Sequence, residues 1–121
     1  MARLGVAIAL LLLTGCRLPG AAEECKAQID WVDFIQVGPT QYVVGPGSPA
    51  TLNETDLGPV VAHVKFKVSG NVCDPGYRPK DGDAAFLEPG TPIYQVTGKP
   101  ARTALAARHD GQIWEYEARS P

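Results

Sequence analysis

The sequence predicts an all-β domain, built as a small barrel or sandwich of about six or seven short strands. Three observations favour this fold class. The 13 glycines and 11 prolines make up about a fifth of the 121 residues, a density typical of many short elements joined by tight turns. Residues 60–69 alternate apolar and polar side chains, as a half-buried strand does. No window of ten or more residues after the N-terminal segment has a convincing helical period.

The first half of the domain contains three predicted strands. Residues 29–37 carry branched and aromatic side chains in both phases of the alternation, which is typical of a strand covered on much of both faces. Residues 41–44 are expected to return as its hairpin partner, and residues 45–58 to form the longest irregular loop. In residues 60–69 one face is predicted to be buried, and it consists of Val60, Ala62, Val64, Phe66 and Val68.

The second half begins with a turn-dense connection, residues 70–83. Four more strands are expected after it, at residues 84–87, 92–96, 103–108 and 113–118. Residues 88–91 have Pro and Gly in the central positions of a type II turn. Asp110-Gly111 between two strand-like segments is a strong hairpin signal, because both residues tolerate the positive φ of a type I′ turn.

The N-terminus has the layout of a secretory signal peptide, predicted to cover residues 1–15. A cationic Arg3 precedes ten apolar or small residues, 4–13. Ten helical residues extend about 15 Å, half of the roughly 30 Å hydrocarbon core of a bilayer. We therefore expect this segment to direct export and to be removed, without remaining as a membrane span.

The end of this segment, Leu13-Thr14-Gly15-Cys16, resembles a bacterial lipobox. The resemblance implies that the Cys16 thiol is acylated and that Cys16 becomes the new N-terminus, on a tether of residues 16–24. Several acyl chains hold a protein firmly on a membrane. The alternative is an ordinary signal peptide, cut near Ala21 or Ala22, with Cys16 discarded.

Lipidation of Cys16 leaves Cys25 and Cys73 as one pair in an exported domain, residues 25–121. A disulfide is the usual outcome in an oxidising compartment, and the chain-entropy model gives a loop of this length roughly 4 kcal/mol of stabilisation. The alternative is two free thiols or half of a metal site. No metal and no cofactor is predicted, because neither cysteine belongs to a CxxC pair and the histidines lie far from them in sequence.

Aromatic side chains are the candidates for a binding surface. Trp114 and Tyr116 share one face of the last predicted strand and are expected to be core residues. The alternative is a surface that binds a peptide or a sugar chain by stacking. Four residues are the candidates for that surface: Trp31, Tyr77, Tyr94 and Trp114.

Catalytic signatures are missing from the sequence. It contains no nucleophile elbow, no glycine-rich phosphate loop and no HExxH motif, so no enzyme activity is predicted. Asp74, Asp81, Asp83 and Glu88 supply oxygen ligands near one connection, but their spacing is that of turns and not of an EF-hand. The formal net charge of −2 does not fit a nucleic-acid-binding surface.

Residues 70–77 (GNVCDPGY), residues 81–92 (DGDAAFLEPGTP) and the closing Asp-Gly and Tyr-Glu-Ala segments are similar to small uncharacterised lipoproteins and exported domains of spore-forming Gram-positive bacteria. The Gly-Thr-Pro-Ile-Tyr phrase of residues 90–94, with the Asp-Gly hairpin, also resembles in a general way the bacterial Src-homology-3-like barrels that bind cell-wall peptides. Neither resemblance implies a catalytic residue.

Together these features predict a lipoprotein on the outer face of a bacterial cell membrane, most simply a non-enzymatic binding or interaction module of the cell envelope. Its expected partners are the membrane, through the lipid, and an envelope protein or a cell-wall polymer. No nucleic-acid partner is expected. The alternatives are a structural or accessory subunit that docks on a membrane complex, and an enzyme of an unrecognised kind.

Overall fold

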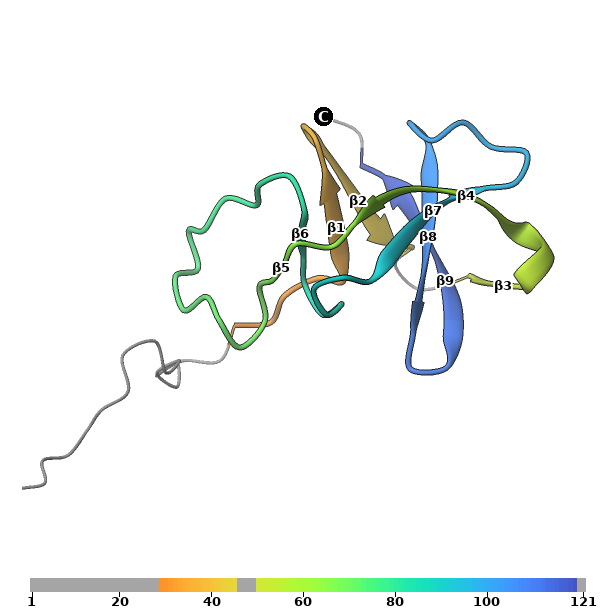
Figure 1. Cartoon of the computed structure of the whole chain (residues 1–121). Coiled ribbons are helices and arrows are strands. Elements are labelled where there is room, and N and C mark those ends of the chain that lie inside the picture. Colours follow the sequence, from red (N-terminus) through yellow and green to blue (C-terminus); the bar gives the residue numbers. More distant parts are fainter. Residues whose placement is uncertain (1–28, 46–49, 120–121) are drawn as a thin grey trace, which may run out of the picture.

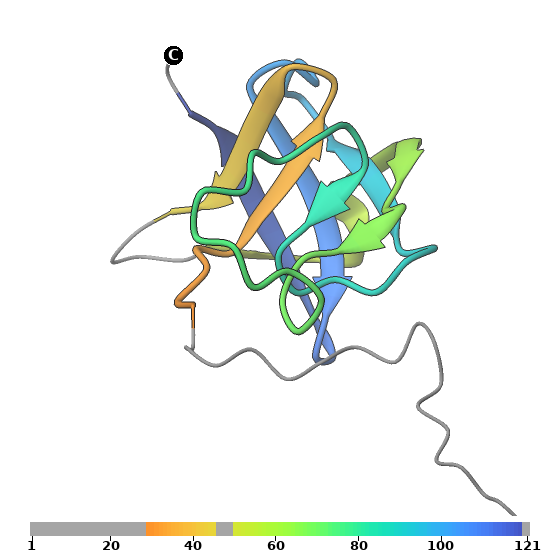
Figure 2. The same ribbon diagram turned by 90° about the vertical axis from the view of Figure 1, so that its left-hand side faces the viewer.

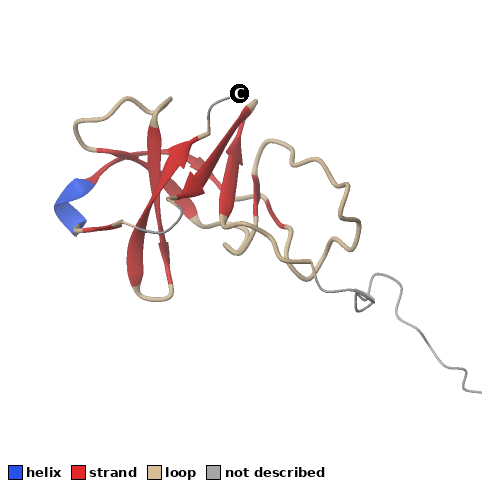
Figure 3. Ribbon diagram, turned by 180° about the vertical axis from the view of Figure 1, so that it is seen from behind, coloured by secondary structure: helices blue, strands red, loops and turns tan. Residues whose placement is uncertain are grey.

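A computed structural model of the chain describes residues 29–45 and 50–119, and the all-β prediction is confirmed (Figures 1 and 3). The described residues form nine strands and one turn of 3₁₀ helix, two strands more than the upper number expected. The elements in chain order are β1 (Phe34–Val37), β2 (Thr40–Val44), β3 (Thr51–Leu52), η1 (Glu54–Asp56), β4 (Leu57–His63), β5 (Phe66–Lys67), β6 (Asp83–Ala84), β7 (Pro92–Val96), β8 (Ala104–His109) and β9 (Gln112–Ala118).

The strands form one strongly curled sheet (Figure 2). Its hydrogen-bonded order is β4-β7-β8-β9-β2-β1-β6-β5, with β3 paired to β9. β4 and β5 lie at opposite ends of this order, yet only Val64 and Lys65 separate them in the chain. The Val64 N–H donates to Thr91 O just before β7, and the Lys65 N–H donates to Gly82 O just before β6. One continuous segment thus bridges both ends of the sheet, which makes the architecture barrel-like and not a sandwich.

The prediction of one continuous strand over residues 60–69 is therefore wrong, because this segment contains the end of β4 and all of β5. Val64 and Val68 are buried as expected, but Val60 is 45% exposed and Phe66 is 36% exposed. The β4–β7 register shifts on both sides of Val60, and the chain changes partner between Val64 and Lys65. Each irregularity breaks the period-two relation between sequence and sheet face, so the pattern does not continue along the segment.

Three other boundaries also differ from the prediction. β1 covers only the last four residues of the predicted strand at 29–37, and the loop predicted at 45–58 contains β3, η1 and the start of β4. β6 spans residues 83–84, whereas a strand was expected at 84–87. β3 was missed because its two residues become a strand only by pairing with β9.

The two predicted turns are confirmed. Gly90 has φ +93° and the Thr91 N–H donates to Glu88 O at 3.1 Å, as a type II turn requires. Asp110 and Gly111 have φ of 52° and 79°, and they join β8 to β9 as a type I′ hairpin does. β7 has the bounds that the sequence predicted.

The main core fills the inside of the curled sheet. Tyr116 of β9 is fully buried there, which confirms its assignment to the core. Its hydroxyl donates to Asp33 Oδ1. The buried members of this cluster are Ile35, Tyr42, Val64, Ala84, Leu87, Ile93, Leu105, Ala107 and Tyr116.

Two segments cover outer faces of the sheet. Outside β1, Phe34 packs with Val68, at the start of the long loop between β5 and β6, and with Ala85, just after β6. This loop lies in front of β1 in Figure 2. Outside β8 and β9, a second cluster that includes Ala106 and Ile113 is covered by side chains of β3 and β4. β1 and β8 are therefore buried on both faces, which explains their nearly continuous apolar sequences.

Candidate functional site

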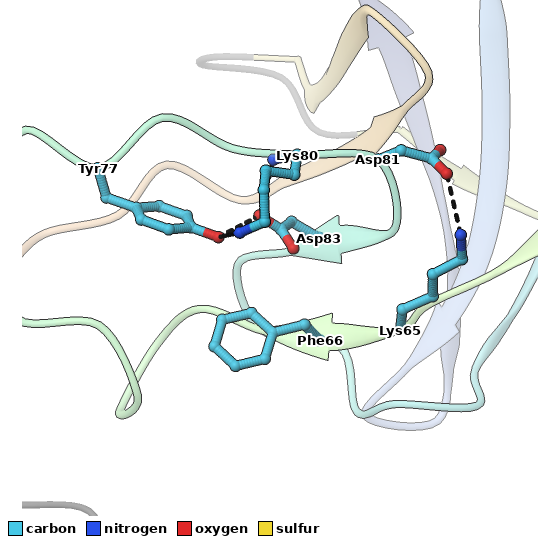
Figure 4. A pocket seen from close by; sticks show the side chains of 6 residues that line it. All are labelled: Lys65, Phe66, Tyr77, Lys80, Asp81 and Asp83. Atoms are coloured by element: carbon cyan, nitrogen blue, oxygen red, sulfur yellow. Dashed lines mark hydrogen bonds and ion pairs between the residues drawn. The ribbon is translucent and has the colours of Figure 1, made fainter.

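A cleft of about 350 Å³ lies between β5 and the end of the β5–β6 loop (Figure 4). We call it the Phe66 cleft. Its volume falls within the range of roughly 300–1,000 Å³ that is typical of small-molecule sites. The residues that line it are Lys65, Phe66, Tyr77, Lys80, Asp81 and Asp83.

A chain of hydrogen bonds forms one wall of the Phe66 cleft. The Lys80 ammonium donates to the Tyr77 hydroxyl oxygen at 2.7 Å, and that hydroxyl donates to Asp83 Oδ2 at 2.6 Å. Asp83 is only 2% exposed and also accepts the Lys80 backbone N–H at 2.8 Å. The Asp83 N–H donates to Lys80 O, so the turn at residues 80–83 is closed from both sides. The buried carboxylate therefore fixes the Tyr77 ring and the start of the Lys80 side chain.

The opposite wall carries an exposed ion pair. Lys65 Nζ lies 3.0 Å from Asp81 Oδ2, and Asp81 Oδ1 accepts the Gly38 N–H at 2.7 Å. The hydrogen bond from Gly38, followed by that from Lys65, lowers the pKa of Asp81 below its usual value. Both oxygens of Asp81 are therefore engaged, and this carboxylate is poorly placed to act as a proton acceptor.

Gly82 determines how closely the two walls approach. Its φ is +92°, and a Cβ at this position would come within 2.5 Å of the Lys65 side chain. The Lys65 stem therefore lies directly against the Gly82 backbone. The Gly82 carbonyl also accepts the N–H groups of Lys65 and Phe66, at 2.8 and 3.3 Å, which holds β5 beside β6. A side chain at residue 82 would force the Lys65 side chain to move.

An aromatic pair adjoins the Phe66 cleft. Trp31 and Tyr77 meet edge to face, with ring centroids 6.5 Å apart and planes at 87°. Trp31 lines a second cavity of about 500 Å³, together with Asp30 and Phe86 among other residues. Tyr77 thus belongs both to the cleft and to the cluster that packs on the outer face of β1.

The structure brings together two of the four aromatic residues predicted for a binding surface. Trp31 and Tyr77 are in contact, whereas Tyr94 packs with the second cluster outside β8 and β9. Trp114 packs against the main core, and its indole N–H donates to His109 O at 3.2 Å. The four residues therefore lie in three different packing environments.

Five residues of the cleft were not among the predicted site residues: Lys65, Phe66, Lys80, and Asp81 and Asp83, which the sequence pattern assigned to turns. Phe66 had been assigned to a buried face, and the break of the strand at Val64 places it in the cleft instead. The two lysines look like ordinary solvated side chains in the sequence. A local signal does exist at Asp81-Gly82, which predicts a turn, but it does not indicate which strand packs on that turn.

The chain matches no protein-family model, no curated protein and no solved structure. We therefore infer function from the chemistry of the cleft and from the N-terminal sequence. Within residues 29–45 and 50–119, no three His, Cys, Asp or Glu side chains are grouped to hold a metal ion. The same part of the chain contains no helix long and apolar enough to cross a membrane.

The cysteine predictions concern the N-terminal region. Cys16, Cys25 and the residues predicted to form the signal peptide and the tether lie outside the described residues. Cys73 lies in the β5–β6 loop at an exposed position, next to Val72, which packs on the cluster around Phe34. The pairing of Cys25 with Cys73 and the lipidation of Cys16 stay predictions.

Proposed function

We propose that this protein is a lipid-anchored binding module of a bacterial cell envelope, held on the outer face of the membrane through acylated Cys16. The Phe66 cleft is its ligand site. The observation that carries the proposal is that an exposed Phe66 ring and the Lys80 ammonium line the same cleft, in which both carboxylates accept hydrogen bonds from the walls. An apolar surface with a few convergent polar groups is the usual composition of a binding site.

The hydrogen bonds of Asp81 and Asp83 favour a binding role for the cleft over a catalytic one. Asp83 accepts hydrogen bonds from the Tyr77 hydroxyl and the Lys80 N–H, and Asp81 accepts them from Gly38 and Lys65. A general base works best with a pKa near the operating pH, and the hydrogen bonds from Gly38 and Lys65 lower the pKa of Asp81. Asp83 Oδ2 and both oxygens of Asp81 instead hold the walls of the cleft.

Anchoring is tested by feeding the native host an alkyne-tagged fatty acid and then separating its proteins with a detergent that phase-separates on warming. We expect the wild-type protein to carry the tag and to enter the detergent phase. Cys16→Ser should lose both properties, whereas the matched control Cys25→Ser should keep them. A wild-type protein that is untagged and stays in the aqueous phase would contradict the proposed anchor.

Binding at the cleft is tested by placing a photo-reactive benzoylphenylalanine at residue 66 in the host. We expect a cross-linked product that disappears when Lys80 is replaced by Met. The same probe at residue 102, which is exposed in the loop before β8, should give no such product. Equal cross-linking from both positions, or none from residue 66, would argue against a binding role for this cleft.

We further propose the Cys25–Cys73 disulfide. Ile29 and Ser69 line the same cavity, and each cysteine lies four residues from one of them in the chain. Four extended residues span up to about 13 Å, so both cysteines have enough chain to meet. Mass spectrometry under non-reducing conditions should find the protein lighter by two hydrogens than after reduction. Alkylation of both residues without reduction would disprove the bridge.

A further inference from the structure

We propose that the Phe66 cleft binds an organic anion, a carboxylate attached to a flat apolar group, with Lys80 as the anchor and the Phe66 and Tyr77 rings as apolar walls. This inference rests on the proposed function, because it names the ligand class of the same site. It follows from the exposure of the charges, the donors left on Lys80 and the shape of the apolar surface.

The four charged side chains of the cleft differ in what they offer to a ligand. Lys65 and Asp81 neutralise each other at 3.0 Å on the cleft rim. Asp83 is buried behind the Tyr77 hydroxyl. Lys80 is exposed, and among the described residues its ammonium hydrogen-bonds to a neutral hydroxyl and to no carboxylate. Within the described residues, Lys80 is therefore the exposed charge of the cleft that has no ion-pair partner.

The Lys80 ammonium retains donor capacity. An ammonium has three N–H donors, and within the described part of the chain one of them is used, toward the Tyr77 hydroxyl. The bond from Lys80 to Tyr77 raises the pKa of Lys80, so the group stays charged at neutral pH. Because Asp83 fixes Tyr77, and Tyr77 fixes the ammonium, the remaining donors are held in place before a ligand arrives.

The apolar part of the ligand is indicated by Phe66. This ring is one of four large apolar side chains exposed among the described residues, and it lines the cleft together with Tyr77 (Figure 4). Aromatic rings bind flat apolar groups by offset or edge-to-face packing. A cavity of about 350 Å³ accommodates a group the size of a phenyl ring with a short acidic chain.

The test uses the full chain with Cys16→Ser, which removes the acylation site, and follows its amide NMR spectrum during titration. Hydrocinnamate is the first probe, and hydrocinnamide, the same molecule without the charge, is its control. We expect hydrocinnamate to shift the amides of Phe66, Tyr77 and Lys80, and hydrocinnamide to bind about tenfold more weakly, since a charge-assisted hydrogen bond is lost.

Two substitutions locate the interaction. Lys80→Met should weaken hydrocinnamate binding about tenfold, and Phe66→Ala by several-fold, because both remove exposed contacts. Arg102→Met, the matched control on the exposed loop before β8, should leave the affinity unchanged. Equal binding of the acid and the amide, or no effect of Lys80→Met, would overturn the proposal.

A second titration tests whether the bound carboxylate belongs to a polypeptide C-terminus or to a free organic acid. N-acetylglycylphenylalanine presents the same chemistry at the end of a peptide, and tighter binding of this probe than of hydrocinnamate would assign the cleft to a polypeptide C-terminus. The reverse order would assign it to a free organic acid. If neither acid binds while residue 66 still cross-links a partner in the host, the ligand class is wrong and the binding role stands.

Discussion

Tyr116 and Asp33 are 83 residues apart in the chain and share a hydrogen bond of 3.2 Å from the Tyr116 hydroxyl to Asp33 Oδ1. The Tyr116 ring is fully buried, and Asp33 is partly buried just before β1. Burial raises the pKa of both groups. This contact joins the C-terminal strand to the entrance of the first strand.

Tyr116→Phe should destabilise the fold by about 1–2 kcal/mol, because it leaves the Asp33 carboxylate partly buried without its donor. Tyr42→Phe is the matched control, since the Tyr42 hydroxyl donates to a neutral acceptor, Ala101 O, at 3.0 Å. Its cost should be smaller, about 0.5–1.5 kcal/mol. Urea unfolding followed by circular dichroism measures both. A larger effect at Tyr42 would show that Asp33 does not depend on Tyr116.

Asp33→Asn should alter the dependence of stability on pH. Burial raises the folded-state pKa of Asp33 above 3.8, against the opposing effects of the Tyr116 hydrogen bond and nearby His109. The folded protein therefore binds this proton more tightly, and ionisation of Asp33 lowers stability as the pH rises from about 4 through the raised pKa.

Asparagine keeps an oxygen acceptor for the Tyr116 hydroxyl and carries no charge. Asp33→Asn should therefore gain stability relative to the wild type: the free energy of unfolding of the variant minus that of the wild type should be larger at about pH 7 than at about pH 3, where Asp33 is itself protonated. The comparison requires urea titrations of both proteins at the two pH values. If the variant and the wild type differ in the free energy of unfolding by the same amount at both pH values, the pKa of Asp33 is not raised.

Removal of β9 should abolish the fold. β9 pairs with β8, β2 and β3, and it supplies Tyr116 to the main core. Loss of one large buried aromatic costs roughly 3–5 kcal/mol, a large part of the roughly 5–15 kcal/mol expected for a whole domain. A chain ending at Asp110 should show no cooperative thermal transition, whereas a chain ending at Arg119 should melt like the full chain. A cooperative thermal transition of the shorter chain would show that the β8–β9 hairpin is not required for the fold.

Gly111→Ala should cost about 1 kcal/mol through backbone strain. Gly111 has φ +79°, and a Cβ there would meet nothing within 4 Å, so no steric clash contributes. The control Gly76→Ala lies in an exposed turn with no positive φ, and it should change stability by less than about 0.5 kcal/mol. Thermal unfolding of both variants gives the comparison. Equal costs would mean that the turn at Gly111 relaxes to another form.

Local chemistry in the sequence predicted much of this fold. The turn at Asp110-Gly111 and the type II turn at residues 88–91 depend on φ values that their own residues prefer, so both are visible without any tertiary contact. The same holds for β7, whose bounds follow from the Pro-Gly turn before it and the Gly98 break after it.

The position of Phe66 was decided by the tertiary structure. Its alternation with Val64 and Val68 is that of a core residue, and both valines are indeed buried. The chain changes hydrogen-bonding partner between Val64 and Lys65, however, so that one segment reaches both ends of the curled sheet. Alternation predicts a face only while a strand keeps one partner and one register.

The sequence by itself thus determined the all-β class, the tight turns and the burial of Tyr116, because each depends on residues close in the chain or on a large apolar side chain. Only the tertiary structure decided how the sheet closes and that Phe66, Tyr77 and Lys80 share a cleft. The physical reason is that closure is a long-range event. The long loop between β5 and β6 folds back on β1, and no local preference encodes which strand its end will meet.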